Sequence, residues 1–295
     1  MTSTAIGIDL GGTRIKGVVI NSSGEILAQK YQQIEMDNWK QVIIQVAEEL
    51  TASVPGEHLA GISAPGIPDK DNSCIAHMPG RLAGLEGLHW GHIFGRETWV
   101  ANDAIAAMAA EAKFGAARGV NHAVMLTLGT GVGGAILING QIYQGAFQKA
   151  GHAGHISVDH EGDPDITGMP GSLEDAIGNC TIKKRSLGKY DYTHELLEDY
   201  KKGDHFAQWL WLSSVRKLSV AIASITNILS PELIILGGGI TEAGPLLFDP
   251  LQQFLALYEW RAGGYKTTLV KAEFGDLAGA IGAAGFAMMQ QDHVK

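Results

Sequence analysis

Two glycine-rich segments are the part of this chain whose residue types and spacing best suit phosphate chemistry. They read Asp9-Leu-Gly-Gly-Thr13 and Leu128-Gly-Thr-Gly-Val-Gly-Gly134, and each follows an apolar run typical of a buried strand. Glycine has no Cβ, so backbone N–H groups in such turns can approach phosphate oxygens closely. The pair of segments therefore predicts two phosphate-binding turns, as in an ATP-dependent phosphotransferase.

The second segment also matches the G-x-G-x-x-G dinucleotide fingerprint, with Gly129, Gly131 and Gly134 at the glycine positions. That fingerprint should open a helix whose N-terminus faces the pyrophosphate. Here the apolar residues 135–138 run directly into Asn139-Gly140, a strong hairpin signal. The context therefore favours a hairpin tip over a dinucleotide site. The chain also contains no G-x-x-x-x-G-K-[ST] sequence, so a Walker-type NTPase is not indicated.

Apolar periodicity places both turns in a mixed α/β chain. The second half begins with the same strand, glycine turn and strand as the first half, which favours an internal duplication. We expect two α/β lobes, 1–118 and 119–295, with residues 115–119 as a hinge and the terminal helix packing back on the first lobe. The predicted strands are 4–10, 14–20, 25–31, 59–63, 98–101, 122–128, 134–138, 141–144, 232–236 and 267–273, and the predicted helices are 37–53, 105–114, 206–229 and 277–290.

Composition and charge exclude several classes of function. Hydrophobic residues make up 45% and charged residues 18%, and no apolar run approaches the roughly 20 residues of a membrane span. We therefore expect a cytoplasmic protein without a membrane partner. The net charge is −9 and the cations are scattered, so a nucleic acid is not an expected partner. The two cysteines, Cys74 and Cys180, match no metal or redox spacing and are expected to be reduced.

Further motifs join the glycine turns, in the chain order Asp9-Leu-Gly-Gly-Thr13, Asn102-Asp103, Leu128-Gly-Thr-Gly-Val-Gly-Gly134, Gly151-His-Ala-Gly-His155, Gly171-Ser-Leu-Glu174 and Leu236-Gly-Gly-Gly-Ile240. In this order they resemble the ROK sugar kinases, and the similarity covers nearly the whole chain. The resemblance implies a two-lobed actin/hexokinase/Hsp70-like (ribonuclease H-like) α/β fold with ATP and sugar in the cleft. It also implies an ATP- and Mg²⁺-dependent carbohydrate kinase that closes over its substrate.

The resemblance assigns a role to each motif. Asp103 is the implied general base, which takes the proton of the attacking sugar hydroxyl. Asp9 is the implied carboxylate associated with the Mg²⁺ of ATP. The other residues implied to bind ATP are Gly11, Gly12, Thr13, Thr130, Gly131, Gly133, Gly237, Gly238 and Gly239, and those implied to bind the sugar are Gly66, Asn102, Asp103, His152, His155 and Glu174.

Structural explanations compete for several of these residues. Asn102 or Asp103 could be a helix N-cap, because both stand directly before an alanine-rich helix. Asp9 could be a turn aspartate, and residues 237–239 could be a glycine turn used for close packing. Lys16 could meet phosphate, although a solvent-exposed strand lysine is the favoured interpretation.

Two departures from the family pattern concern the acceptor side. Family members carry three cysteines that bind a structural zinc together with a histidine, and here those cysteine positions hold Asp165, Thr167 and Ser172, while His155 is retained. Thr and Ser are poor zinc ligands, so no structural zinc is expected. A rearranged metal site using His152, His155, His160, Asp163 or Asp165 is the less favoured alternative. In addition, His152 stands where the family has a glutamate that binds sugar hydroxyls.

Because imidazole offers one donor and one acceptor where a carboxylate offers only acceptors, the hydroxyl specificity is expected to differ from that of glucokinases. The expected partner is a small sugar or polyol whose identity the sequence does not name. The alternative function is a catalytically weak sugar sensor or regulator on the same fold. Repressors of this family carry a helix-turn-helix before the first strand, where this chain has few residues, so DNA binding is not expected. Dimers are common among similar proteins, and a homodimer is therefore compatible with the resemblance.

Overall fold

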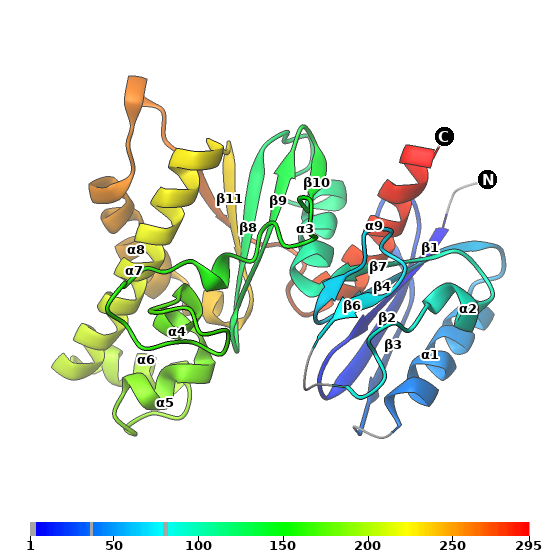
Figure 1. Ribbon diagram of the computed structural model, residues 1–295, viewed down its shortest axis with the longest axis horizontal. Helices are drawn as coiled ribbons and strands as arrows, with labels where there is room; N and C mark the ends of the chain where they lie inside the picture. Colours follow the sequence, from blue (N-terminus) through cyan, green and yellow to red (C-terminus); the bar gives the residue numbers. More distant parts are fainter. Residues whose placement is uncertain (1–3, 36–37, 79–81, 295) are drawn as a thin grey trace. The chain divides into compact units, whose positions relative to one another are not determined.

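The computed structural model describes residues 4–35, 38–78 and 82–294 of the 295-residue chain. It divides into two compact units (Figure 1). The first unit comprises Met1–Val120, Ile136–Ala150 and Ala272–Lys295, and the second comprises Asn121–Ala135 and Gly151–Lys271. Each unit contains both strands and helices, which confirms the predicted mixed α/β class.

The sheet of the first unit has the strand order β3-β2-β1-β4-β7. β1 pairs antiparallel with β2 and parallel with β4, and β4 pairs parallel with β7. The turn between β1 and β2 is therefore a hairpin tip, as the apolar pattern predicted. The strands are β1 (Thr4–Leu10), β2 (Arg14–Ile20), β3 (Ile26–Gln33), β4 (His58–Ala64) and β7 (Thr98–Asn102).

Helices cover both faces of this sheet (Figure 1). Side chains alternate between the faces of a strand, so Ile6 and Ile8 of β1 pack with α1 (Trp39–Ser53), whereas Ala5 packs with α9 (Ala278–Val294). The third helix, α3 (Asp103–Phe114), packs on α9. Asp37, which begins the predicted first helix, lies outside the described residues.

The small residues of α9 allow unusually close packing on the sheet. A Cβ on Gly7 of β1 would lie 1.9 Å from the carbonyl oxygen of Ala280, and a Cβ on Gly61 of β4 would lie 2.0 Å from that of Ala283. Only glycine fits at these two strand positions, because real Cβ atoms do not approach backbone oxygens so closely. The first turn of α9 is thereby held against the strands that carry Asp9 and Ser63.

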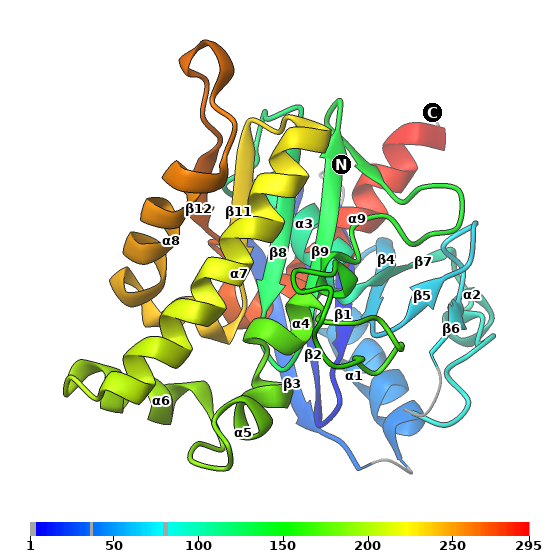
Figure 2. The same ribbon diagram turned by 60° about the vertical axis from the view of Figure 1, so that its left-hand side comes forward.

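The second sheet has the order β10-β9-β8-β11-β12; β8, β11, β12 and the start of β9 belong to the second unit, and β10 belongs to the segment Ile136–Ala150 of the first. The predicted Asn139-Gly140 turn joins β9 to β10, and both residues have positive φ, as a type I′ hairpin turn requires. Figure 2 shows the long helix α7 with α4, α6 and α8 beside it. The strands are β8 (Ala123–Leu128), β9 (Val132–Ile138), β10 (Gln141–Tyr143), β11 (Leu233–Gly237) and β12 (Thr268–Lys271), and the helices are α4 (Leu173–Ile177), α5 (Ile182–Arg185), α6 (Thr193–Lys201), α7 (His205–Leu229) and α8 (Pro245–Tyr258).

Several short elements escaped the sequence pattern. The stretch 65–90 has no predicted strand or helix, and it holds β5 (Ile67–Pro68), β6 (Ile75–His77) and the first residue of α2 (Trp90–Phe94). α4, α5, α6 and α8 were not predicted either. Among the described residues, no helix has the length and apolar character needed to cross a membrane.

Candidate active site

The first unit gathers its predicted site residues at the carboxyl ends of three neighbouring strands. The strand register places Asp9 of β1 beside Ser63 of β4, and Ala64 of β4 beside Asn102 of β7. Asp103 follows as the first residue of α3. The carboxyl ends of parallel strands are where open α/β sheets bind ligands, so the topology itself brings these side chains to one edge.

Asp9 is the most buried carboxylate of this edge, and within the described residues its side chain receives a hydrogen bond from a neutral group. The hydroxyl of Ser63 donates to its Oδ1 over 2.8 Å. Burial raises the pKa of Asp9 above its ordinary value; Ser63 and Lys16 oppose this effect, and the negative charges of Asp103 and Asp276 add to it. A cation at this edge would relieve the same repulsion. The arrangement fits Mg²⁺, which proteins often hold through one or two carboxylates together with phosphate oxygens.

A helix end also contacts Asp9. A Cβ on Gly279, in the first turn of α9, would lie 2.5 Å from Cγ of the Asp9 carboxylate. The glycine therefore lets the N-terminus of the helix approach the carboxylate, where the helix dipole favours negative charge. Sequence reasoning missed Gly279, because a glycine in a run of small helical residues carries no local sign of a distant neighbour.

Lys16 corrects a sequence-based interpretation. The favoured view was a solvent-exposed strand lysine, but the residue is only 9% exposed. Its Nζ donates to the carboxylate of Asp276 over 2.6 Å and to the backbone oxygen of the same residue over 2.7 Å. Arg14 reaches the same carboxylate over 3.1 Å. Asp276 lies just before α9 and is 260 positions from Lys16 in the sequence, so no local pattern could reveal the pair.

The glycine tip at Gly11, Gly12 and Thr13 joins β1 to β2 on the surface of the unit. The N–H of Gly11 donates to the carbonyl of Arg14 over 3.1 Å, which closes the turn. A Cβ on Gly12 would meet no atom within 4 Å, so space alone does not require glycine there. Gly12 and Thr13 are exposed. The tip can therefore present backbone to a ligand, as the phosphate prediction needs.

The sequence left open whether Asn102 or Asp103 caps α3, and the structure places the two side chains differently. Asn102 is the N-cap of α3, since its side-chain oxygen accepts from the N–H of Ala104 over 3.0 Å. Its side-chain nitrogen donates to the carbonyl of Gly66 over 2.9 Å. Asp103 is exposed, although its Oδ1 also accepts from Ala104 N over 2.9 Å. The buried asparagine thus caps the helix and fixes the Gly66 loop, while the aspartate carboxylate stands at the surface.

In the second unit, Glu174 closes the second glycine tip. Its Oε2 accepts from the N–H of Val132 over 2.9 Å, and a Cβ on Gly131 would lie 2.1 Å from the same oxygen. The backbone oxygen of Thr130 accepts from Cys180 N over 2.8 Å. Gly133 lies beyond the tip, as the second residue of β9. The structure therefore joins Thr130 and Gly131, predicted for phosphate, to Glu174, predicted for the sugar.

The segment 151–155 lies along β9 of the same unit. A Cβ on Gly154 would lie 2.1 Å from the carbonyl oxygen of Val132, so this residue packs directly on the strand that leaves the glycine tip. His152 is the N-cap of the short 3₁₀ helix Ala153–His155, and His155 is its last residue. The Nδ1 of His155 lies 3.0 Å from Oδ2 of Asp165. His155 is thus held by Asp165 in a segment that packs on Val132.

Residues 237–239 have mixed roles. Gly238 has φ of +85° and packs on the end of β8, where a Cβ would lie 2.4 Å from the carbonyl oxygen of Leu128. This contact supports the structural explanation of a turn used for close packing. A Cβ on Gly239 would meet nothing within 4 Å, so this residue borders open space. Gly237 is the last residue of β11.

Comparison with known proteins identifies the family. The sequence profile of the ROK family matches residues 5–290. The chain belongs to the ROK family. It is 30% identical to a glucokinase of Thermotoga maritima, with 95% of each chain covered. It is also 23% identical to a xylose repressor of Caldicellulosiruptor bescii, over 94% of this chain and 76% of the repressor.

A solved ROK structure has the same fold. The ROK family glucokinase from Streptomyces griseus, solved in complex with glucose and AMPPNP, matches with a TM-score of 0.81 and 26% identity, covering 97% of this chain and all of the other. The fold class expected from the sequence is thereby confirmed as that of the ROK sugar kinases. The family includes both kinases and repressors, so membership alone does not decide which activity this chain has.

The zinc site of ROK proteins has no fitting donor set in this chain. The hydroxyl of Thr167 donates to Asp165 over 2.7 Å, and the hydroxyl of Ser172 accepts from Asp175 N at the start of α4. Both hydroxyls are therefore engaged within the protein, and hydroxyl groups are weak zinc ligands in any case. The described residues also contain no group of three or more His, Cys, Asp or Glu side chains that could hold a metal. The residues present do not fit a zinc cage.

Proposed function

We propose that the protein transfers the γ-phosphoryl group of ATP to a hydroxyl of a sugar or polyol. The observation that carries this proposal is the exposed carboxylate of Asp103, at the strand edge that also holds the partly buried Asp9. Phosphoryl transfer needs a phosphate cradle, a cation and a group that orients the acceptor hydroxyl. At this edge Asp9 is the candidate to hold the cation, and Asp103 is the candidate to orient the hydroxyl. A cytoplasmic location, where ATP and Mg²⁺ are available, goes with the proposal.

Asp103 is the proposed general base. As the acceptor oxygen bonds to the γ-phosphorus and ADP departs, the hydroxyl proton passes to the Asp103 carboxylate. The N-terminus of α3 stabilises the carboxylate before transfer. Asn102, through its bonds to Ala104 N and Gly66 O, fixes the start of the helix and so the position of its neighbour. Asp9 would associate with the Mg²⁺ of ATP.

The proposed roles in the second unit concern binding. Thr130 and Gly131 would contact phosphate, with Gly133 at the start of β9 and Gly239 beside the nucleotide. His155 and Glu174 would bind acceptor hydroxyls, and His152 would set a preference that differs from glucose. The contact between Glu174 and the glycine tip supports this grouping, because one carboxylate then touches both the phosphate-side backbone and the acceptor side.

A sugar-responsive regulator is the second candidate. The similarity to the xylose repressor supports it, since that relative shares the family over most of its length. The replacement of the family glutamate by His152 points the same way, because weakened acceptor binding would lower turnover. A regulator of this kind would bind a sugar without measurable phosphoryl transfer.

An acceptor screen distinguishes the two candidates. ADP release would be measured with MgATP and hexoses, N-acetylhexosamines, ketoses and polyols, using Asp103→Asn as the blank and Asp249→Asn, an exposed change on α8, as the matched control. We expect acceptor-dependent ADP release that Asp103→Asn lowers by about a hundredfold or more, the usual scale of general-base catalysis. Retention of most activity in Asp103→Asn would contradict its role. No signal with any acceptor, together with sugar binding by calorimetry, would favour the regulator.

A further inference from the structure

Asp165 lies at the centre of a buried hydrogen-bond network in the second unit. Its side chain has no exposed surface. Oδ2 faces Nδ1 of His155 at 3.0 Å, and Oδ1 accepts from the N–H of Thr167 at 2.8 Å, its hydroxyl at 2.7 Å and the N–H of Met169 at 3.0 Å. Burial alone would raise the pKa of Asp165, but these hydrogen bonds outweigh it and hold the pKa well below its ordinary value. The carboxylate thus stays ionised while fully enclosed.

The same carboxylate closes the loop that carries it. The backbone N–H of Asp165 donates to the carbonyl of Met169 over 2.9 Å, and its carbonyl accepts from Gly168 N over 2.9 Å. Short antiparallel bridges join Ser157 to Ser172 and Pro164 to Pro170. The loop therefore forms a narrow hairpin-like excursion between the 3₁₀ helix that ends at His155 and the start of α4. Through its hydrogen bond with His155, Asp165 links the loop to the 3₁₀ helix from which the loop starts.

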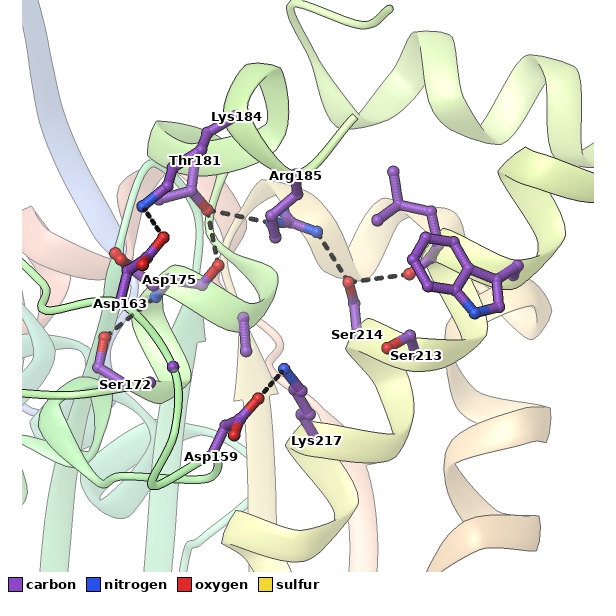
Figure 3. Close-up of a pocket in the computed structure, with 15 residues that line it drawn as sticks. Asp159, Asp163, Ser172, Asp175, Thr181, Lys184, Arg185, Ser213, Ser214 and Lys217 are labelled. Atoms are coloured by element: carbon purple, nitrogen blue, oxygen red, sulfur yellow. Dashed lines mark hydrogen bonds and ion pairs between the residues drawn. The ribbon is translucent and has the colours of Figure 1, made fainter. Parts of the chain in front are cut away.

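Figure 3 shows how the outer side of the loop is attached. Lys184 of α5 pairs with Asp163 over 2.8 Å, and Lys217 of α7 pairs with Asp159 over 3.0 Å. These four side chains line a cavity of about 310 Å³ together with Arg185 and other residues of α4, α5 and α7. All four are substantially exposed, and exposed ion pairs contribute little to stability. The enclosed network of Asp165 is therefore the stronger attachment of the loop.

We propose that Asp165 is a positioning residue that orders this loop and His155 without a metal, in the place where ROK relatives use zinc. Asp165, Thr167 and Ser172 occupy the three cysteine positions, and each has a structural role of its own. Asp165 accepts, Thr167 donates to it, and Ser172 caps α4 two residues before Glu174. The network thus spans the segment from one proposed acceptor-binding residue to the other. The functional part of this inference rests on the proposed kinase activity.

The choice of a carboxylate has a chemical consequence for His155. An ionised carboxylate can only accept hydrogen bonds, so the Nδ1 of His155 carries a hydrogen and donates it to Asp165. In the neutral ring the other nitrogen, Nε2, is then an acceptor. A partner behind a functional histidine commonly fixes both its ring orientation and its tautomer. A neutral His155 would then accept a hydrogen bond from an acceptor hydroxyl through Nε2.

The test compares Asp165→Asn with Asp163→Asn, a matched change at an exposed carboxylate of the same loop. We expect Asp165→Asn to lose hydrogen-exchange protection in residues 156–172 and to raise the KM of the acceptor by about tenfold or more, the scale of a lost bond to a charged group. The KM of ATP should stay nearly constant, and Asp163→Asn should behave as wild type. Loop protection unchanged in Asp165→Asn, or one zinc per purified wild-type chain by elemental analysis, would overturn the proposal.

A rebuilt cage provides the second measurement. The triple variant Asp165→Cys, Thr167→Cys, Ser172→Cys restores three thiolates beside His155. We expect it to bind about one zinc per chain, as a four-ligand site does, and to recover loop protection only when zinc is present. A triple variant that binds no zinc would overturn the equivalence of the two arrangements. Hydrogen exchange and zinc content need no turnover, so they test this inference even if no acceptor is phosphorylated and the proposed function fails.

Discussion

Ser63 donates a hydrogen bond of 2.8 Å to the carboxylate of Asp9, across two parallel strands whose register sets these residues side by side. On the other side of Asp9, the register places Lys16, but the Lys16 ammonium bonds to Asp276 instead. The direct bond to the partly buried Asp9 carboxylate therefore comes from a neutral hydroxyl. Such a carboxylate remains short of compensating charge, which suits a group that receives a cation during function.

Removing the Ser63 hydroxyl should weaken MgATP use. In Ser63→Ala, the hydrogen bond that lowers the pKa of Asp9 is lost, so this pKa rises further and the ionised form is populated only at higher pH. We expect the KM of MgATP to increase by roughly threefold to tenfold, the scale of one hydrogen bond. The acid limb of the pH profile of kcat/KM should move to higher pH. Steady-state kinetics over a pH series measures both effects.

Ser53→Ala is the matched control, since the Ser53 hydroxyl donates to the carbonyl of Glu49 on the exposed face of α1. It should leave both the KM of MgATP and the acid limb unchanged. A pH profile of Ser63→Ala that coincides with that of wild type would show that Asp9 does not control the acid limb.

Neutralising Asp9 should stabilise the fold while removing function. Its pKa is raised in the folded state by burial, so the unfolded chain ionises at the lower pH. Ionisation then favours unfolding, and stability is lost as pH rises from roughly 4 through the raised pKa. Asp9→Asn removes this loss, and Asn still accepts from Ser63. At pH 7 we expect a Tm about 2 °C higher, which corresponds to roughly 1 kcal/mol in a chain of this size.

Calorimetry at pH 4 and pH 7 checks the sign of this effect, because the difference between Asp9→Asn and wild type should shrink at the lower pH. MgATP-dependent turnover should be lost in the same variant. A Tm at pH 7 below that of wild type would refute the view that the buried charge of Asp9 destabilises the fold.

Replacement of Arg185 by lysine should lower the stability of the fold. Its guanidinium donates to Thr181 Oγ1, Ser214 Oγ and Gly178 O over 2.7 to 3.0 Å, as Figure 3 shows for the two hydroxyl groups. Burial lowers the pKa of Arg185 to about 10, so it remains a cation at neutral pH. A lysine has no planar fork to reach three acceptors. Arg185→Lys should lower the free energy of unfolding by roughly 2 to 3 kcal/mol, measured by urea denaturation.

The control for Arg185 is Arg261→Lys, because within the described residues the Arg261 side chain donates to Glu259 and is partly exposed. It should change stability by about 0.5 kcal/mol or less, as is usual for surface substitutions. Equal effects of the two variants would mean that the buried hydrogen bonds of Arg185 add no stability.

Much of the fold was predictable because its strands carry strong local signals. The hairpins after Leu10 and Leu128 follow from apolar runs interrupted by glycine, and the Asn139-Gly140 turn follows from its dipeptide. The helices α4 to α6 and α8 were missed. α4 and α5 span only five and four residues, too few for helical periodicity to emerge, and α8 contains Pro250, which argues locally against a helix.

The sequence by itself determined which residue types are candidates for the site and their order along the chain. Backbone N–H groups in glycine turns and carboxylates at strand ends have chemistry that does not depend on distant neighbours. Tertiary structure alone decided the partners. It places Ser63 and Gly279 in contact with Asp9. It also pairs Lys16 with Asp276, and His155 with Asp165. Strand register, close helix packing and loop closure join residues far apart in sequence. A local pattern therefore shows which groups can react, and packing determines the charge and hydrogen bonds with which they do so.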